Sequence, residues 1–194
     1  MKKLLITGFQ PFDGENINPS WEAVSHLPGE IGGYRLTKLC IPVEFGRAAK
    51  EVIKIADGIL PDAILCVGQA GGRAAITPEL VGINLRHATI ADNVGYKPSD
   101  ELIIPDGAAA YFSTLPVRKI ADAINKAGIS AGVSYSAGAY VCNDTLYTLL
   151  AHFENSHTRV GFIHIPYCTE QVKEPAMEMA DIIRALTIAV ESIE

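Results

Sequence analysis

Helix and strand patterns alternate most clearly in residues 142–165, CNDTLYTLLAHFENSHTRVGFIHI. Apolar side chains recur at the helical period after Cys142, which predicts a helix over Cys142–Phe153. The apolar run that follows predicts a strand over Arg159–Ile165, with His164 near its end. A helix followed directly by a buried strand is the repeating unit of α/β proteins.

The same alternation extends along the rest of the chain. Further strands are predicted at Lys2–Ile6, Arg35–Cys40, Ala63–Val67, Ile76–Asn84 and Gly132–Tyr135. Further helices are predicted at Pro19–Leu27, Glu44–Ala56, Pro116–Lys126 and Glu174–Ile193. This spacing predicts an α/β fold with a largely parallel, twisted central sheet and helices on both faces. Because no linker or repeat interrupts the pattern, residues 1–194 are expected to form a single domain.

The composition argues against two broad function classes. The chain has a net charge of −6 and no Lys/Arg-rich run, so it lacks the basic surface of a nucleic-acid-binding protein. The apolar run near the amino end stops at Gly8, which is too short for a signal peptide or a membrane span. We therefore expect a cytoplasmic protein that binds neither nucleic acid nor membranes.

The cysteines are expected to be reduced thiols. Cys40, Cys66, Cys142 and Cys168 form no Cys-x-x-Cys pair and no Cys/His cluster with the spacing of a zinc site, so no metal is expected. Cys40 and Cys66 end apolar runs, which is typical of small core residues.

Cys142 has the sequence setting of a nucleophile. It follows a glycine-containing turn, SAGAYV (residues 136–141), and begins the predicted helix. The unpaired N–H groups and positive dipole of a helix start favour a thiolate and can form an oxyanion hole. A buried structural cysteine is the alternative, and the local pattern alone does not decide between the two.

His164 could act as the base for such a cysteine. It lies at the end of its predicted strand, just before Pro166, where a histidine would project over the edge of the sheet. A histidine in an apolar run is also common as a hydrogen-bonded core residue.

Glu79 interrupts the apolar stretch from Ile76 to Ile83 and therefore needs a partner. A histidine ring N–H is one candidate, and the pair would hold the imidazole in one tautomer. Arg73 and Arg86 are nearby in the sequence and offer a structural salt bridge instead.

Two loops that follow predicted strands are expected beside these residues, because ligand sites of α/β sheets gather at the carboxyl ends of the strands. Gly68–Arg73 lacks the patterns of nucleotide-binding loops and predicts a tight turn. Phe9 and Phe12, after the first strand, either fill the core or line a pocket.

Together these motifs closely resemble the pyroglutamyl peptidase I (pyrrolidone carboxyl peptidase) family of cysteine peptidases. The similarity covers almost the whole chain, through ITGFQPFDGENINPSWEAV (6–24), VGQAGGRAAITPE (67–79), DGAAAYFSTLP (106–116), SAGAYVCNDTLY (136–147) and GFIHIPY (161–167). The resemblance implies that Glu79, Cys142 and His164 form a catalytic triad. It also implies a three-layer α/β/α sandwich, a cytoplasmic location, no cofactor, and a homo-oligomer, often a tetramer.

The activity implied by the resemblance is hydrolysis after an N-terminal pyroglutamyl (5-oxoprolyl) residue of a peptide. A lactam carries no ammonium group, so its site needs a flat apolar slot with a hydrogen-bond donor and acceptor. Phe9 and Phe12 can supply the slot, and Gln69 has both a donor and an acceptor. By resemblance, the pocket would be completed by Tyr140, Ile90 and Val43.

Three positions depart from the family pattern. Thr89 stands where arginine is usual, Ala139 where threonine is usual, and Leu80 where a basic residue is common. We expect these changes to affect rate and substrate range more than reaction class.

Two alternatives remain open at this point. The first is a binding protein for pyroglutamyl or related lactam groups that has lost turnover. The second is an enzyme acting on a glycosidic bond, which would need a phosphate site or paired carboxylates that the sequence does not show.

Overall fold

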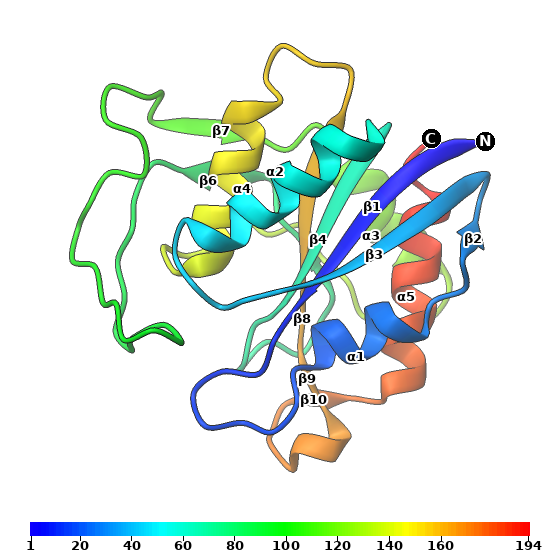
Figure 1. Cartoon of the computed structure of the whole chain (residues 1–194). Coiled ribbons are helices and arrows are strands. Elements are labelled where there is room, and N and C mark those ends of the chain that lie inside the picture. Colours follow the sequence, from blue (N-terminus) through cyan, green and yellow to red (C-terminus); the bar gives the residue numbers. More distant parts are fainter.

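The computed structural model describes residues 1–194 and is built around one six-stranded sheet (Figure 1). Its strands, in spatial order, are β2 (Glu30–Ile31), β3 (Tyr34–Ile41), β1 (Lys2–Phe9), β4 (Ala63–Gln69), β8 (Arg159–Ile165) and β5 (Thr77–Pro78). The four central strands are parallel, and the short edge strands β2 and β5 are antiparallel to their neighbours. The predicted largely parallel, mixed sheet is confirmed.

Five helices cover the two faces of this sheet: α1 (Pro19–His26), α2 (Arg47–Ile59), α3 (Val117–Lys126), α4 (Val141–His152) and α5 (Met179–Glu191). Helices α1, α3 and α5 pack on one face, and α2 and α4 pack on the other (Figure 1). The three-layer α/β/α sandwich implied by the resemblance is therefore confirmed. None of the helices has the length and apolar character that crossing a bilayer requires.

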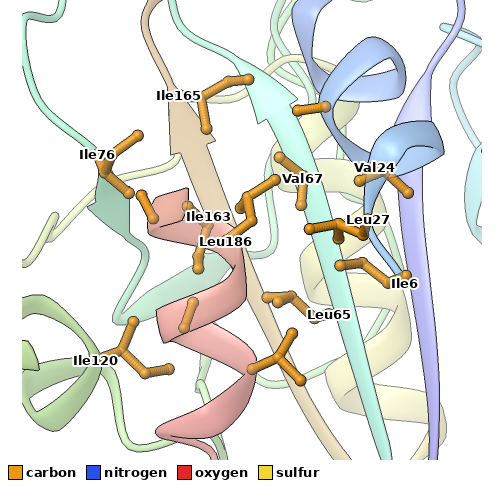
Figure 2. Close-up of a cluster of buried hydrophobic side chains, with 14 of the residues drawn as sticks. Ile6, Val24, Leu27, Leu65, Val67, Ile76, Ile120, Ile163, Ile165 and Leu186 are labelled. Atoms are coloured by element: carbon orange, nitrogen blue, oxygen red, sulfur yellow. The ribbon is translucent and has the colours of Figure 1, made fainter. Parts of the chain in front are cut away.

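Alternation along the central strands supplies two separate cores, one for each helix layer. On β4, Leu65 points toward α1 and α5, whereas its neighbour Ile64 points toward α2 and α4, and both are fully buried. Figure 2 shows the first of these cores, to which Leu65 of β4, Ile163 of β8 and Leu186 of α5 all contribute. This two-sided burial accounts for the positive mean hydropathy of +0.20.

Of the predicted strands, one is wrong and a second is only partly right. Gly132–Tyr135 is not a strand, because the segment makes a single isolated bridge, between Ser134 and Glu79. Ile76–Asn84 is broken into β5 and a separate strand β6 (Val81–Ile83), which pairs with β7 (Ala110–Phe112). Pro78 has no N–H to continue a ladder, which favours a break at this point.

The last predicted helix begins at Met179 rather than at Glu174. The residue before Pro175 is disfavoured in helical conformation, and the next residues form strand β10 (Ala176–Met177). β10 pairs with β9 (Tyr167–Cys168), and the 3₁₀ helix η1 (Thr169–Gln171) lies between them. After η1 the chain therefore returns to lie beside β9, parallel to it and close to the carboxyl end of β8.

Candidate active site

The start of helix α4 meets the carboxyl ends of the central strands. Cys142 is the second residue of α4, and His164 is the residue before the last of β8. Gly68 of β4 pairs in register with His164. A Cβ atom added at Gly68 would lie 3.0 Å from the Cys142 sulfur and 2.8 Å from the Phe162 ring. A glycine at this position thus lets the helix start approach the sheet beside His164.

His164 is held by Glu79. Its Nδ1 atom lies 2.7 Å from Glu79 Oε1, and both side chains are almost completely buried. Glu79 follows β5, and its backbone N–H donates to the Phe162 carbonyl at 2.9 Å. In the neutral imidazole, this bond places the proton on Nδ1 and leaves Nε2 as an acceptor.

Arg73 is the second partner of Glu79. Its Nη1 atom donates to the same Oε1 atom at 2.7 Å and also to Thr77 Oγ1 at 2.7 Å. Both candidate partners, the histidine and Arg73, therefore bind the glutamate. Arg86 does not, because its Nε atom donates to Asp144 at 2.6 Å.

Burial and hydrogen bonding set the protonation states of the three residues. Burial alone would raise the pKa of Glu79, but the hydrogen bond and charge of His164 and the hydrogen bond from Arg73 outweigh it and lower this pKa. Burial lowers the pKa of His164, so the ring is neutral at neutral pH. Burial raises the pKa of Cys142 to about 12, and the negative charge of Glu79 adds to this effect.

In this structure, burial of the sulfur opposes the expected stabilisation of a Cys142 thiolate by the helix start. Loss of solvent around the sulfur outweighs the favourable contributions of Arg73 and of the backbone. The resting pair is a thiol and a neutral imidazole. The first N–H groups of α4 have no acceptor within the helix, so they remain available to an oxyanion.

An apolar cavity opens beside the cysteine. It is lined by Phe9, Phe12, Asn18, Val43, Gln69, Tyr140 and Cys142. All the predicted pocket residues except Ile90 are in this set; the Ile90 side chain is 38% exposed and does not line the cavity. Wider hollows occur elsewhere, the largest of about 540 Å³ near the amino terminus, but none is lined by a cysteine, and only one, beside His26, is lined by a histidine.

The aromatic residues of the cavity have more than one role. Phe9 is the last residue of β1, is 2% exposed and packs against Phe162 with ring centroids 6.2 Å apart. It therefore fills the core and lines the cavity at once. Phe12 faces Tyr140 across the cavity at 6.4 Å, and Tyr140 packs edge-on against Phe45 at 5.2 Å.

Asn18 is a cavity residue that the sequence analysis missed. It caps helix α1, where its Oδ1 atom accepts the backbone N–H of Ser20 at 3.1 Å. An asparagine before Pro19 is a helix-start signal, but only the tertiary structure shows that the cap also lies beside Cys142.

A family model described as pyroglutamyl peptidase matches residues 2–194. The chain belongs to the pyroglutamyl peptidase family. The family resemblance drawn from its motifs is confirmed, and with it the expectation that the chain is a peptidase.

Relatives of known name cover nearly the full length of this peptidase. A pyrrolidone-carboxylate peptidase of Erwinia tasmaniensis is 47% identical over 195 residues, which are 98% of this chain and 92% of the relative. One from Thermococcus kodakarensis is 45% identical and covers 98% of this chain and 95% of the relative. The crystal structure of Bacillus amyloliquefaciens pyroglutamyl peptidase I superposes with a TM-score of 0.96 at 44% identity, covering 100% of this chain and 97% of that one.

The three departures from the family pattern lie outside the cavity lining. Thr89 is exposed. The Ala139 backbone carbonyl accepts the His87 backbone N–H at 2.9 Å. The Leu80 backbone N–H donates to the Ser134 backbone carbonyl at 2.8 Å. In this member of the peptidase family, the cation nearest the glutamate is Arg73. No group of three or more His, Cys, Asp or Glu side chains is arranged to hold a metal ion.

Proposed function

We propose that this peptidase hydrolyses the bond after an N-terminal pyroglutamyl residue, with Cys142 as nucleophile, His164 as base and Glu79 as the group that orients the histidine. The observation that supports it most is the buried 2.7 Å contact between His164 and Glu79 next to a cysteine that lines an apolar cavity. A nucleophile, a base and a group that orients the base, placed in this way, are the minimum set for acyl transfer.

The cavity chemistry supports a lactam as the bound group. Phe9, Phe12, Val43 and Tyr140 provide apolar walls, and no carboxylate lines the cavity. A free peptide amino terminus would therefore lose its hydration without gaining a counter-charge, which is costly. An uncharged five-membered lactam avoids that cost. Gln69 and Asn18 are the polar side chains that can bind its amide.

Acylation would begin from the neutral thiol. As the Cys142 sulfur attacks the carbonyl carbon that joins pyroglutamate to the next residue, its proton moves to Nε2 of His164. The backbone N–H groups at the start of α4 stabilise the oxyanion. The imidazolium then donates this proton to the leaving nitrogen, the C–N bond breaks, and a thioester to Cys142 remains.

Deacylation would use the same residues in reverse. His164 takes a proton from water, the resulting oxygen attacks the thioester carbonyl, and the C–S bond breaks. Free pyroglutamate leaves, and the proton on His164 returns to the sulfur. Glu79 stays ionised throughout, because Arg73 and His164 hold its pKa below the usual range.

We also propose, from the family resemblance, that the protein is cytoplasmic and assembles as a homo-oligomer. Several large apolar side chains are exposed and would be available to an interface, namely Leu102, Phe112 and Tyr135. Sedimentation velocity of the purified protein measures the assembly state directly, and a monomer at all concentrations would contradict the second part of the proposal.

A substrate panel tests the proposed activity. The protein is expected to release a fluorogenic amine from a pyroglutamyl conjugate, and to release far less from the prolyl and glutamyl conjugates, which lack the lactam carbonyl or the ring. If the well-folded protein released no amine from the pyroglutamyl conjugate, the enzyme proposal would fail, and calorimetry with 2-pyrrolidone would test the binding-protein alternative.

A further inference from the structure

We propose that Gln171 is a positioning residue that sets the polarity of the Gln69 side-chain amide, so that the cavity offers an N–H donor to the ring carbonyl of the substrate. The inference rests on the proposed function and specifies how its lactam is recognised. Gln171 ends the 3₁₀ helix η1, 102 residues from Gln69.

The orientation of Gln171 is determined by a backbone group. The backbone N–H of Cys168 donates to Gln171 Oε1 at 3.2 Å, and the Cys168 thiol lies 3.7 Å from the same atom. A backbone N–H can only donate, so the side-chain atom facing it must be the carbonyl oxygen. Amide oxygen and nitrogen are assigned from such networks, and here the network has a fixed starting point.

The same argument then determines the orientation of Gln69. Gln171 Nε2 lies 2.9 Å from the Gln69 side chain. Because an amide NH₂ group can only donate, the Gln69 atom that faces it must be Oε1. Gln69 Nε2 makes no hydrogen bond within the protein, and Gln69 lines the cavity together with Cys142. In the substrate complex, Gln69 therefore acts as a donor through Nε2.

The side-chain amide of Asn18 also uses its oxygen within the protein and keeps an N–H group available, for an independent reason. Its Oδ1 atom accepts from the Ser20 backbone N–H at 3.1 Å and from the Ser20 hydroxyl at 2.8 Å. Its Nδ2 atom donates to the Gln10 carbonyl at 3.0 Å, which leaves one N–H free. Both side-chain amides of the cavity thus offer N–H groups. A lactam oxygen accepts two hydrogen bonds, so this arrangement selects a ring that carries a carbonyl group.

Gln171→Glu reverses the polarity with little change in shape. A carboxylate has only acceptors, so one oxygen keeps the Cys168 N–H and the other faces Gln69. Gln69 must then turn its NH₂ group toward the carboxylate and its carbonyl toward the cavity. The dissociation constant of 2-pyrrolidone, measured by titration calorimetry, should rise about tenfold or more. The reason is that the hydrogen bond from Gln69 to the ring carbonyl is lost and two carbonyl oxygens face each other instead. KM for the pyroglutamyl conjugate should rise with it, while kcat changes little.

Two further variants separate the effect of the Gln69 amide orientation on affinity from the effects of added charge and of altered packing. Gln171→Met removes the donor without adding an acceptor, so Gln69 can adopt either orientation and the loss of affinity should be intermediate. Val172→Asp adds the same charge one residue away, at a side chain that is 93% exposed and at a φ of 53°, which aspartate tolerates. It should leave the affinity for 2-pyrrolidone unchanged.

The outcomes distinguish this inference from the proposed function. If Gln171→Glu binds 2-pyrrolidone as well as the wild type does, or if Val172→Asp reproduces the loss, the polarity argument is overturned. If the wild type binds 2-pyrrolidone but releases no amine from a pyroglutamyl conjugate, the proposed activity fails, and the calorimetric comparison still decides the role of Gln171.

Discussion

At the level of single residues, the resting site keeps its negative charge on Glu79 rather than on Cys142. Glu79 Oε1 receives hydrogen bonds from both Arg73 and His164, whereas burial keeps the Cys142 sulfur protonated. In the proposed mechanism, the proton therefore moves from the sulfur to Nε2 of His164 as the sulfur attacks. This differs from a site in which a thiolate and an imidazolium exist before substrate binds.

The pH dependence of kcat/KM should accordingly show only an acid limb. Burial lowers the pKa of His164 from 6.5, so activity is kept until the pH falls through that lowered value and protonates the base. Because the pKa of Cys142 is raised to about 12, we expect a plateau on the alkaline side. The profile can be measured with the pyroglutamyl conjugate. A fall in kcat/KM between about pH 7 and about pH 9 would indicate a preformed ion pair instead.

Gly68 provides a second test at this scale. In Gly68→Ala, the added methyl group would crowd Phe162 at 2.8 Å and the Cys142 sulfur at 3.0 Å, so kcat should fall by about tenfold or more and stability by about 1–3 kcal/mol. Gly58→Ala is the matched control, because its methyl group would meet nothing within 4 Å and lies within helix α2, where alanine is favoured by about 0.5–1 kcal/mol. Equal activity in the two variants would show that the close approach at Gly68 is not needed.

At the level of elements, helix α4 is anchored by the two residues that follow Cys142. Asn143 binds the N–H and carbonyl of Ile83, both at 2.9 Å, and the Leu85 carbonyl at 3.0 Å. Asp144 accepts from the Gly46 N–H at 2.7 Å and from Arg86 at 2.6 Å. These contacts tie the first turn of the helix to the end of β6 and the residues after it, and to the loop that also carries the cavity residue Val43.

Asp144→Asn should loosen this anchor. The amide has one acceptor oxygen, so its NH₂ group must face either the Gly46 N–H or Arg86, and neither can accept. We expect the free energy of unfolding in urea to fall by about 2 kcal/mol or more. Asp122→Asn, on the exposed side of α3, should change it by less than about 0.5 kcal/mol. If both variants were equally stable, the Asp144 contacts would contribute nothing to the anchor.

Elements with continuous apolar patterns could be predicted from the sequence, and those that depend on distant partners could not. Ala63–Val67 and Arg159–Ile165 are buried on both faces, so their composition alone indicates strands. Gly132–Tyr135 has a strand-like pattern but lacks a continuous partner. The polarity of Gln69 depends on the position of η1, which brings Gln171 to it, and no local pattern contains that information. The pKa of Cys142 likewise depends on tertiary burial, which overrides the helix-start effect.

At the level of the whole molecule, the two cores are coupled through the sheet they share. Ile64 and Leu65 are neighbours on β4 but belong to opposite cores. Loss of packing on one face therefore weakens strands that the other face also needs. The two ends of the chain also meet, because Lys2 at the start of β1 forms an ion pair of 2.8 Å with Glu194. We propose that residues 1–194 fold as one domain.

This proposal predicts a single unfolding transition. Ile64→Ala and Leu65→Ala each remove a fully buried side chain, and each should lower the free energy of unfolding by about 2–5 kcal/mol. Thermal unfolding followed by calorimetry should remain one transition, shifted to lower temperature in both variants. Two transitions, of which each variant shifts only one, would indicate that the two helix layers unfold independently.

The most direct test of the account is to trap the covalent intermediate. Wild-type protein mixed with a pyroglutamyl conjugate and quenched with acid within one turnover should carry one added pyroglutamyl group, mapped by mass spectrometry to the peptide containing Cys142. Cys142→Ser should carry no thioester and lose nearly all amine release, while remaining as stable as the wild type. Full amine release by Cys142→Ser, or an adduct on Cys40, Cys66 or Cys168 instead, would contradict the assignment of Cys142 as the nucleophile.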